Sequence, residues 1–284
     1  MTLFNADDYG ITDAQAAHIR ECRKNGRLTG VSAMPNSQRL DKAMAALADD
    51  PGLHVAVHLN LTEGCCLSDP AEVPLLAAPN GRFRGSFARL LLLSVSPWRK
   101  RLLAQMRREF AAQMGRVRSL AGDRPLRLDG HQHIQMIPAV LRAARDAAWE
   151  LGLAPSYVRW SAEPLAPYLR HRELWRDYKP VNVLKNLVLN VLSRFGGRYM
   201  RDLGLRKNMV MGLVISGNLE YRLVSALLPD FERLAAERDC DLELVMHPGW
   251  GIRSGEGLDV PGGPFEAFYL DPGRLREYEC LKKL

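Results

Sequence analysis

The sequence has no cysteine pattern and no long apolar run. Its 284 residues include five cysteines, an odd number without C-x-x-C spacing, which disfavours both a disulfide framework and a structural zinc site. No window approaches the roughly 18 consecutive apolar residues of a membrane-spanning helix. The N-terminal region contains Asp7, Asp8 and Asp13, whereas a secretory signal peptide needs an uninterrupted apolar core. We therefore expect a cytoplasmic protein without an integral membrane segment.

Motifs of two large enzyme classes are also missing. There is no G-x-G-x-x-G and no G-x-x-x-x-G-K-[ST], so a glycine-rich loop for nucleotide phosphates has no support. There is no G-x-S-x-G, which removes the usual nucleophile elbow of a serine hydrolase. Cys65 and Cys66 have no adjacent basic residue that would favour a thiolate nucleophile. Activation of water by a metal ion is the hydrolytic chemistry that remains.

The composition is that of a folded globular protein with an excess of basic residues. Hydrophobic residues make up 47% and charged residues 25%, and the net charge is +7. Such a charge can attract nucleic acid, an anionic membrane or an acidic substrate. The densest basic run, Arg99-Lys100-Arg101, lies on a predicted helix without interleaved aromatic residues for base stacking. We interpret this run as a solvated helix face and expect no nucleic-acid partner.

Short apolar segments alternate with segments of helical periodicity along the whole chain. This alternation predicts an α/β protein, with a single domain spanning residues 1–284. The expected fold is (β/α) barrel-like, with about seven parallel strands and surrounding helices. Strands are expected at 2–6, 28–33, 53–59, 126–129, 157–160, 209–215 and 242–246. Helices are expected at 13–24, from 37 to about 50, after 98, from 138 to 151, and at 221–237.

Two regions interrupt the alternation. Residues 62–98 are rich in glycine, proline and small residues and resemble an inserted loop region. Residues 165–208 contain the apolar and basic segment Val181–Phe195. We interpret that segment as a barrel helix packed on its sheet. The alternative is an amphipathic helix that lies on a membrane and brings the protein to a lipid-linked sugar.

Four polar stretches fall at or just after the ends of predicted strands. They are Asn5–Gly10, His58–Asn60, Asp129–His133 and His247–Gly249. The carboxyl ends of parallel strands meet at one edge of the sheet, where open α/β sheets and barrels place their functional sites. We therefore expect the four stretches to form one site.

Asp8, His58 and His131 are the candidate ligands of one divalent metal ion, Zn²⁺ or Mg²⁺. One carboxylate and two imidazoles can hold such an ion and leave positions open for water and substrate. In zinc enzymes the ion brings the pKa of bound water to about 7. Asp7 is then free to act as a general base, and His247 is suited to protonating a leaving amine.

Each of these residues also has a simpler explanation. Adjacent aspartates after a strand often form only a turn and a helix cap, and a lone His58 is more often a core histidine. His131 and His133 can be a chance pair, although in an extended segment they share a face. Asp129 either orients a ligand histidine or caps a helix. The convergence of all four stretches favours the metal site.

The chain resembles the YdjC-like carbohydrate deacetylases, a family that includes chitooligosaccharide deacetylases and a hopanoid-associated branch. The similar motifs are Asn5-Ala-Asp-Asp-Tyr-Gly10, His58-Leu-Asn-Leu-Thr-Glu-Gly64, Leu128-Asp-Gly-His-Gln-His133 and Glu243-Leu-Val-Met-His-Pro-Gly249. Together they span nearly the whole chain in the family's order. The resemblance implies a (β/α) barrel-like fold, an N-acetylated carbohydrate as substrate, and removal of its N-acetyl group as acetate.

Carried over by position, the resemblance implies that Asp7 is the general base and that His247 is the proton donor. It also implies three metal ligands, which are Asp8, His58 and His131. Arg159 falls where the family tends to have an arginine near the substrate. His133 matches a motif position that implies either a substrate contact or a place beside the ligands.

Two features depart from the family pattern. The chain ends at Leu284, where the family usually continues into another strand or helix, so either an eighth barrel element is absent or more chain belongs to it. Residues 165–208 are only loosely similar, which leaves the acetylated sugar and its length open. A metal-dependent phosphoesterase and a catalytically silent sugar-binding protein are the alternative functions. The pattern is compatible with a homodimer and does not fix the oligomeric state.

Overall fold

A computed structural model shows seven strands in one curved, parallel sheet within the residues it describes. The described residues are 1–253, 255–256 and 263–284, and only the backbone is described for residues 198–201. The strand order is β5-β4-β3-β2-β1-β7-β6, and each pairing is parallel. The strands are β1 (Thr2–Tyr9), β2 (Gly30–Ala33), β3 (His54–Leu59), β4 (Arg127–Gly130), β5 (Tyr157–Val158), β6 (Asn208–Met211) and β7 (Asp241–Met246). The predicted barrel-like α/β fold is confirmed.

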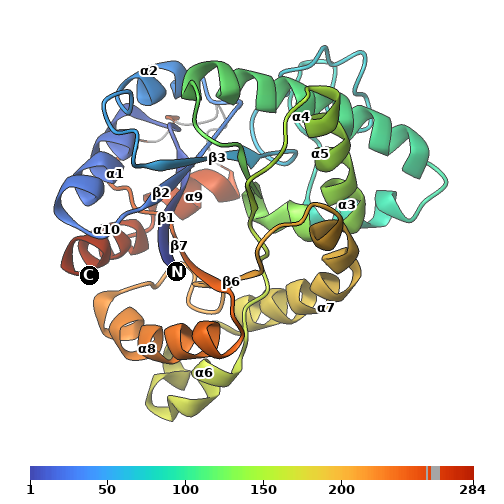
Figure 1. Ribbon diagram of the computed structural model, residues 1–284. Helices are drawn as coiled ribbons and strands as arrows, with labels where there is room; N and C mark the ends of the chain where they lie inside the picture. Colours follow the sequence, from blue (N-terminus) through green and yellow to red (C-terminus); the bar gives the residue numbers. More distant parts are fainter. Residues whose placement is uncertain (254, 257–262) are drawn as a thin grey trace.

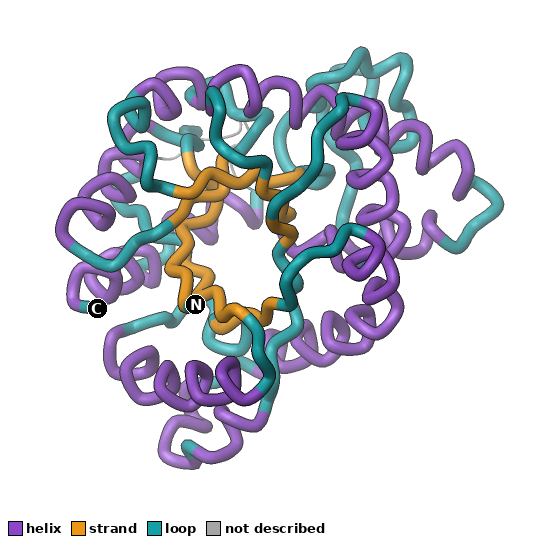
Figure 2. The backbone as a smooth tube through the Cα atoms, viewed as in Figure 1, coloured by secondary structure: helices purple, strands orange, loops and turns teal. Residues whose placement is uncertain are grey.

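The two edge strands, β5 and β6, are joined by a side chain instead of a strand ladder. Asn208 donates from Nδ2 to the Val158 carbonyl at 2.9 Å and accepts from the Trp160 backbone nitrogen at 2.7 Å. The Val210 nitrogen donates to the Ala162 carbonyl at 3.1 Å. An amide side chain offers the same donor and acceptor as a peptide group. The strands can therefore surround a common centre, as Figure 2 shows.

Helices cover the outside of the sheet (Figure 1). They are α1 (Asp13–Asn25), α2 (Leu40–Ala45), α3 (Phe87–Ser94), α4 (Arg99–Ala121), α5 (Pro138–Glu150), α6 (Ala166–Arg170), α7 (Pro180–Asp202), α8 (Tyr221–Glu237), α9 (Pro264–Leu270) and α10 (Gly273–Lys283), with 3₁₀ helices η1 (His131–Met136) and η2 (Arg172–Asp177). The sheet-facing side of α8 carries Leu223, Val224, Leu227 and Phe231, the spacing of an amphipathic helix. Within the described ranges, no helix has both the length and the apolar character needed to cross a membrane.

Some predicted element boundaries differ from the structure for local reasons. Helix α1 extends to Asn25 and follows Thr12, which caps it because its Oγ1 accepts from the Gln15 nitrogen at 3.1 Å. Strand β6 ends at Met211, because the three following backbone nitrogens donate to the Glu163 carboxylate. The region predicted as an inserted loop contains α3, which Ser86 caps.

The interior of the barrel is polar. Asn5 and Asp7 alternate along β1 and therefore share one face. Ser32 of β2, Asp129 of β4 and Glu243 of β7 are buried with them. Buried polar groups destabilise a fold unless they are paired, so the partners of these side chains define the site.

Candidate active site

Asp7 and Asp8 lie at the carboxyl end of β1, where the strand is irregular. The register with β2 shifts between Ala6 and Tyr9, and Asp8 has a left-handed backbone with φ of 59°. Consecutive residues of a regular strand point to opposite faces, and a bulge redirects them. Both carboxylates thus reach His58: each belongs to a cluster with this histidine in which the possible ligand atoms lie within 4.8 Å of one another.

Asp8, His58 and His131 form the first of these clusters. Asp8 Oδ1 lies 3.1 Å from His58 Nε2 and 2.9 Å from His131 Nδ1. All three side chains are buried, although they come from β1, β3 and η1. Asp7, His58 and Asp129 form the second cluster. The structure therefore brings the three predicted ligands together and places the predicted base beside them.

The first cluster fits a divalent cation. His58 Nδ1 lies 2.7 Å from Asp129 Oδ1, so Nδ1 carries a hydrogen, and in the neutral ring the Nε2 lone pair faces Asp8 Oδ1. Two acceptors at this distance repel each other unless a cation or a proton lies between them. Of the two roles predicted for Asp129, the structure shows the contact with His58 that the orienting role requires.

The electrostatics of His58 lead to the same conclusion. Burial by itself would lower the pKa of His58, but the carboxylates of Asp129 and Asp7 raise it to about 10. A positive charge is therefore strongly favoured at this position. Among the described residues, Asp8 Oδ1 and His131 Nε2 are also buried without a hydrogen-bond partner. A metal ion would supply both the charge and the missing partner of Asp8.

Two side chains that the motifs did not indicate hold Asp8. The Tyr269 hydroxyl of α9 donates to Asp8 Oδ2 at 2.6 Å. Gln15 of α1 donates to the Asp8 carbonyl at 2.8 Å and accepts from the Gly10 nitrogen at 3.2 Å. Gln15 is a polar residue on the buried face that α1 forms with Ala16 and Ile19, which is a signal that sequence reasoning could have used. Tyr269 offers no such signal.

Arg159 lies behind Asp7 and has no solvent exposure. Its Nη1 and Nη2 donate to Asp7 Oδ2 and Oδ1, both at 2.8 Å. Nη2 also lies 3.0 Å from Asp129 Oδ2 and 2.8 Å from Glu243 Oε1. The substrate contact implied by the family resemblance does not follow from this location, because three carboxylates of the chain itself enclose the guanidinium. Arg159 instead fixes the orientation of Asp7.

Asp7 is held in its ionised form. Burial would raise its pKa, but Arg159 and the nearby His58 and His247 lower it well below the ordinary value. Asp7 Oδ1 accepts from Asn5 Nδ2 at 2.8 Å as well as from Arg159, and Ser32 Oγ lies 3.0 Å away. Within the described residues, Oδ2 accepts from Arg159 alone. Oδ2 therefore has a lone pair left for a proton.

His247 follows β7 and is held by α10. Its backbone nitrogen donates to Glu277 Oε2, and its carbonyl accepts from Arg274 Nη1 at 3.3 Å. Its Nδ1 lies 3.8 Å from Glu277 Oε2. Burial lowers the pKa of His247, and the carboxylates of Glu277 and Asp7 partly offset this effect. The carboxyl-terminal helix thus contributes to the site.

His133 lies in a segment that is not extended, contrary to the expectation. Gln132 and His133 have left-handed φ angles of 53° and 58°. His133 Nδ1 lies 2.9 Å from Ser161 Oγ, to which Gln135 Nε2 donates at 3.0 Å. Burial and the charge of Arg159 lower the pKa of His133 to about 3. The ring is therefore neutral at physiological pH.

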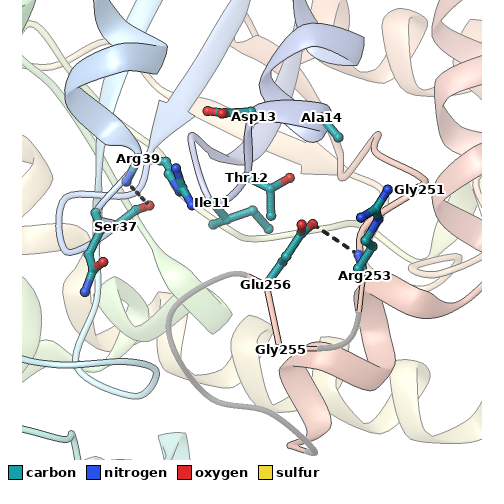
Figure 3. Close-up of a pocket in the computed structure, with 11 residues that line it drawn as sticks. Ile11, Thr12, Asp13, Ala14, Ser37, Arg39, Gly251, Arg253, Gly255 and Glu256 are labelled. Atoms are coloured by element: carbon teal, nitrogen blue, oxygen red, sulfur yellow. Dashed lines mark hydrogen bonds between the residues drawn. The ribbon is translucent and has the colours of Figure 1, made fainter.

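A cavity of about 470 Å³ lies among loops that follow the candidate site residues in the sequence (Figure 3). The segments after β1 and β2 form its walls together with Gly251, Arg253, Gly255 and Glu256. Thr12 follows Asp8 by four residues, and Gly251 follows His247 by four. The candidate metal ligands are not among the lining residues. The cavity and the metal cluster therefore have no residue in common.

The sequence as a whole matches one protein family. Residues 2–283 match the family described as "YdjC-like protein", and the chain belongs to this family. A "putative cellobiose-phosphate cleavage protein" from Enterococcus faecalis V583 has a similar structure, with 21% sequence identity, coverage of 99% of this chain and 90% of that chain, and a TM-score of 0.68. This likeness shows a shared fold. A "putative deoxyribose-phosphate aldolase" from Toxoplasma gondii ME49 matches at 13% identity over 86% of each chain, and its TM-score of 0.34 supports no argument.

Proposed function

We propose that this member of the YdjC-like family is a metal-dependent hydrolase that removes the N-acetyl group from an amino sugar or oligosaccharide and releases acetate. The family supports a carbohydrate-processing enzyme. The observation that carries the proposal is the buried Asp8, His58 and His131 cluster beside a second carboxylate, Asp7, which Arg159 keeps ionised. These are the parts that hydrolysis of an unactivated amide requires.

Asp8, His58 and His131 would hold one divalent ion. Two imidazoles and a carboxylate suit Zn²⁺, whereas Mg²⁺ prefers oxygen ligands. When bound, the ion would supply Lewis-acid polarisation of the amide carbonyl. Asp129 fixes the tautomer of His58, and Tyr269 fixes the carboxylate of Asp8. Such supporting contacts commonly set metal affinity.

Asp7 and His247 carry the protons. Asp7 Oδ2 accepts a proton from the attacking water, whose oxygen forms the new bond to the acetyl carbon. His247 gives a proton to the amine nitrogen as the C–N bond breaks. The lowered pKa of His247 makes its imidazolium form a stronger acid than an ordinary histidine. Asp7 then returns its proton to solvent and His247 takes one up. The sum is the consumption of one water and the release of acetate and a free amine.

A metal-dependent phosphoesterase is less well supported. A phosphoryl substrate needs cationic groups that reach its oxygens, and the arginine that the family resemblance implies near the substrate is Arg159. Its guanidinium is fully buried and already paired with Asp7, Asp129 and Glu243. The name of the Enterococcus protein concerns a phosphorylated disaccharide, and phosphorylated sugars therefore belong in the substrate panel.

The test is an acetate-release assay on N-acetylated mono-, di- and oligosaccharides, with and without a phosphate group. The metal-stripped protein is reloaded with Zn²⁺ or Mg²⁺, and a generic phosphodiester is assayed in parallel. We expect acetate release that depends on metal and falls by about 10²- to 10⁴-fold in Asp7→Asn and His247→Gln. Phosphodiester cleavage without acetate release would favour the phosphoesterase, and sugar binding without turnover would favour the silent binding protein.

A further inference from the structure

The net positive charge of the chain comes from two segments. Residues 73–108 and 178–201 contain thirteen of the 39 Lys and Arg residues and none of the 32 Asp and Glu residues. The remaining residues therefore carry 26 basic against 32 acidic side chains and are net negative. The two segments contain α3, the start of α4 and nearly all of α7. So uneven a distribution indicates a partner of opposite charge on one part of the surface.

The outer face of α7 combines these charges with apolar side chains. Between residues 181 and 197 eight positions are exposed, and each is either apolar or basic. The apolar ones are Val181, Leu184, Leu187, Val188, Val191 and Phe195, with Leu184 62% and Phe195 65% exposed. Lys185 and Arg194 are the basic ones. A water-facing barrel helix normally presents polar residues on this side. The outer face of α7 therefore suits contact with an apolar partner outside the protein core.

The end of α3 and the turn that follows it have the same character. Leu92 is 69%, Val95 79% and Trp98 53% exposed. Arg99, Lys100 and Arg101 follow directly and are also exposed. Further along α4, Arg107 and Arg108 pair with Glu150 and Glu72, so the charge of α4 that has no ion pair among the described residues is concentrated near the turn.

These two surfaces belong to one side of the molecule. The inner residues Phe87 and Leu91 of α3 pack against a cluster that contains Leu189 and Leu192 of α7. Figure 1 shows α3 and α7 on the side of the barrel opposite α1 and α10. We call the exposed apolar and basic residues of α3, α7 and the turn at 95–101 the apolar-basic face.

We propose that the apolar-basic face docks the protein on an anionic lipid bilayer. Exposed Leu, Val, Phe and Trp side chains can enter the boundary between headgroups and acyl chains, while Lys and Arg contact anionic lipids. A second copy of the chain is a poorer fit, because a two-fold interface would place two acid-free basic segments opposite each other. Single-stranded nucleic acid is also a poorer fit, because most of the exposed apolar residues are aliphatic and cannot stack on bases.

The apolar-basic face lies directly behind part of the site. Leu189 and Leu192, on the inner side of α7, share their cluster with Met136, the last residue of η1. The same 3₁₀ helix begins with His131. Docking through α7 would therefore leave the site close to the bilayer surface. The docking proposal stands independently of the reaction catalysed.

The test is co-sedimentation of the full chain with vesicles of phosphatidylcholine alone or mixed with phosphatidylglycerol. We expect binding to the anionic vesicles only, weakened by added salt. Lys185→Glu with Arg194→Glu should lower the partition coefficient by at least about 25-fold, at about fivefold for each basic residue. Leu184→Gln with Val191→Gln and Phe195→Gln should lower it by at least about tenfold without any change in charge.

Matched controls come from the opposite side of the barrel. Leu275→Gln and Lys283→Glu alter an exposed leucine and an exposed lysine of α10 and should bind as the wild type does. Circular dichroism checks that each variant is folded. The proposal is overturned by equal binding to neutral vesicles, by no binding to either kind, or by an equal loss in the α10 controls. It is also overturned if light scattering shows a dimer that the apolar variant converts to a monomer, or if DNA is bound in place of lipid.

Discussion

Replacing Arg159 with Met should destabilise the protein in a way that depends on pH. The change removes a fully buried guanidinium that pairs with Asp7, Asp129 and Glu243 at 2.8 to 3.0 Å. Removing one partner of a buried ion pair typically costs about 3–5 kcal/mol, because the other charge stays buried. Three carboxylates lose their partner here. We therefore expect the free energy of unfolding at pH 7 to fall by an amount at the upper end of that range.

The pH dependence follows from proton uptake. In the wild type the pKa of Asp7 lies below its ordinary value of 3.8, so its contribution is fully present at pH 7 and at pH 5. Without the guanidinium, burial raises the pKa of a carboxyl group, and the folded variant gains stability as the pH falls. One proton taken up over two pH units corresponds to about 2.7 kcal/mol. The difference in unfolding free energy between wild type and variant should therefore narrow by that amount at pH 5.

Urea unfolding of the metal-free protein at both pH values measures this difference. Arg222→Met is the matched control, because Arg222 pairs with Asp177 and Glu220 but is 55% exposed. It should cost less than about 1 kcal/mol at either pH. Arg159→Lys keeps the charge but loses the bidentate contact. It takes the place of Arg159→Met in the same measurement if the Met variant does not fold. A loss for Arg159→Met that is the same at pH 7 and pH 5 would contradict the electrostatic reasoning.

The second and third predictions concern neighbours of the candidate ligands. Asp129→Asn should weaken metal binding by about 10- to 100-fold, because the carboxylate that orients His58 loses its charge; calorimetric titration with Zn²⁺ measures this, and an unchanged affinity would leave Asp129 without that role. His133 has its pKa lowered from 6.5 to about 3 by burial, so its contribution to stability is present above pH 6.5 and is lost as the pH falls. His133→Gln should reduce the stability difference between pH 7 and pH 5 by about 1 kcal/mol, half the full effect because the ring is partly exposed; an unchanged difference would mean that the ring titrates normally.

The strands and the convergence of the site could be predicted because both depend on short-range patterns. Apolar segments such as 53–59 and 242–246 lie close to β3 and β7. Parallel pairing then brings the ends of β1, β3, β4 and β7 to one edge, which unites Asp8 with His58 and His131. The alternation of side chains along a strand could not predict which groups surround Asp7 and which surround Asp8. The irregular end of β1 determines the direction of both side chains.

The supporting contacts could not be predicted, because they depend on packing between distant parts of the chain. Tyr269 is 261 residues from Asp8 in sequence. Glu277 of α10 accepts a hydrogen bond from the His247 backbone nitrogen, which lies 30 residues earlier in the sequence. Asn208 closes the barrel through a side-chain amide, which has no pattern of its own. The buried position of Arg159 likewise requires three carboxylates from three other strands.

The central claim is that Asp8 binds the metal whereas Asp7 handles the proton. The most direct measurement is the metal content and Zn²⁺ affinity of Asp7→Asn and Asp8→Asn, each purified, stripped and reloaded beside the wild type. Asp7→Asn should bind one ion with an affinity close to that of the wild type and release acetate about 10²- to 10⁴-fold more slowly, whereas Asp8→Asn should lose the ion. Loss of metal in Asp7→Asn together with retention in Asp8→Asn would contradict this division of roles.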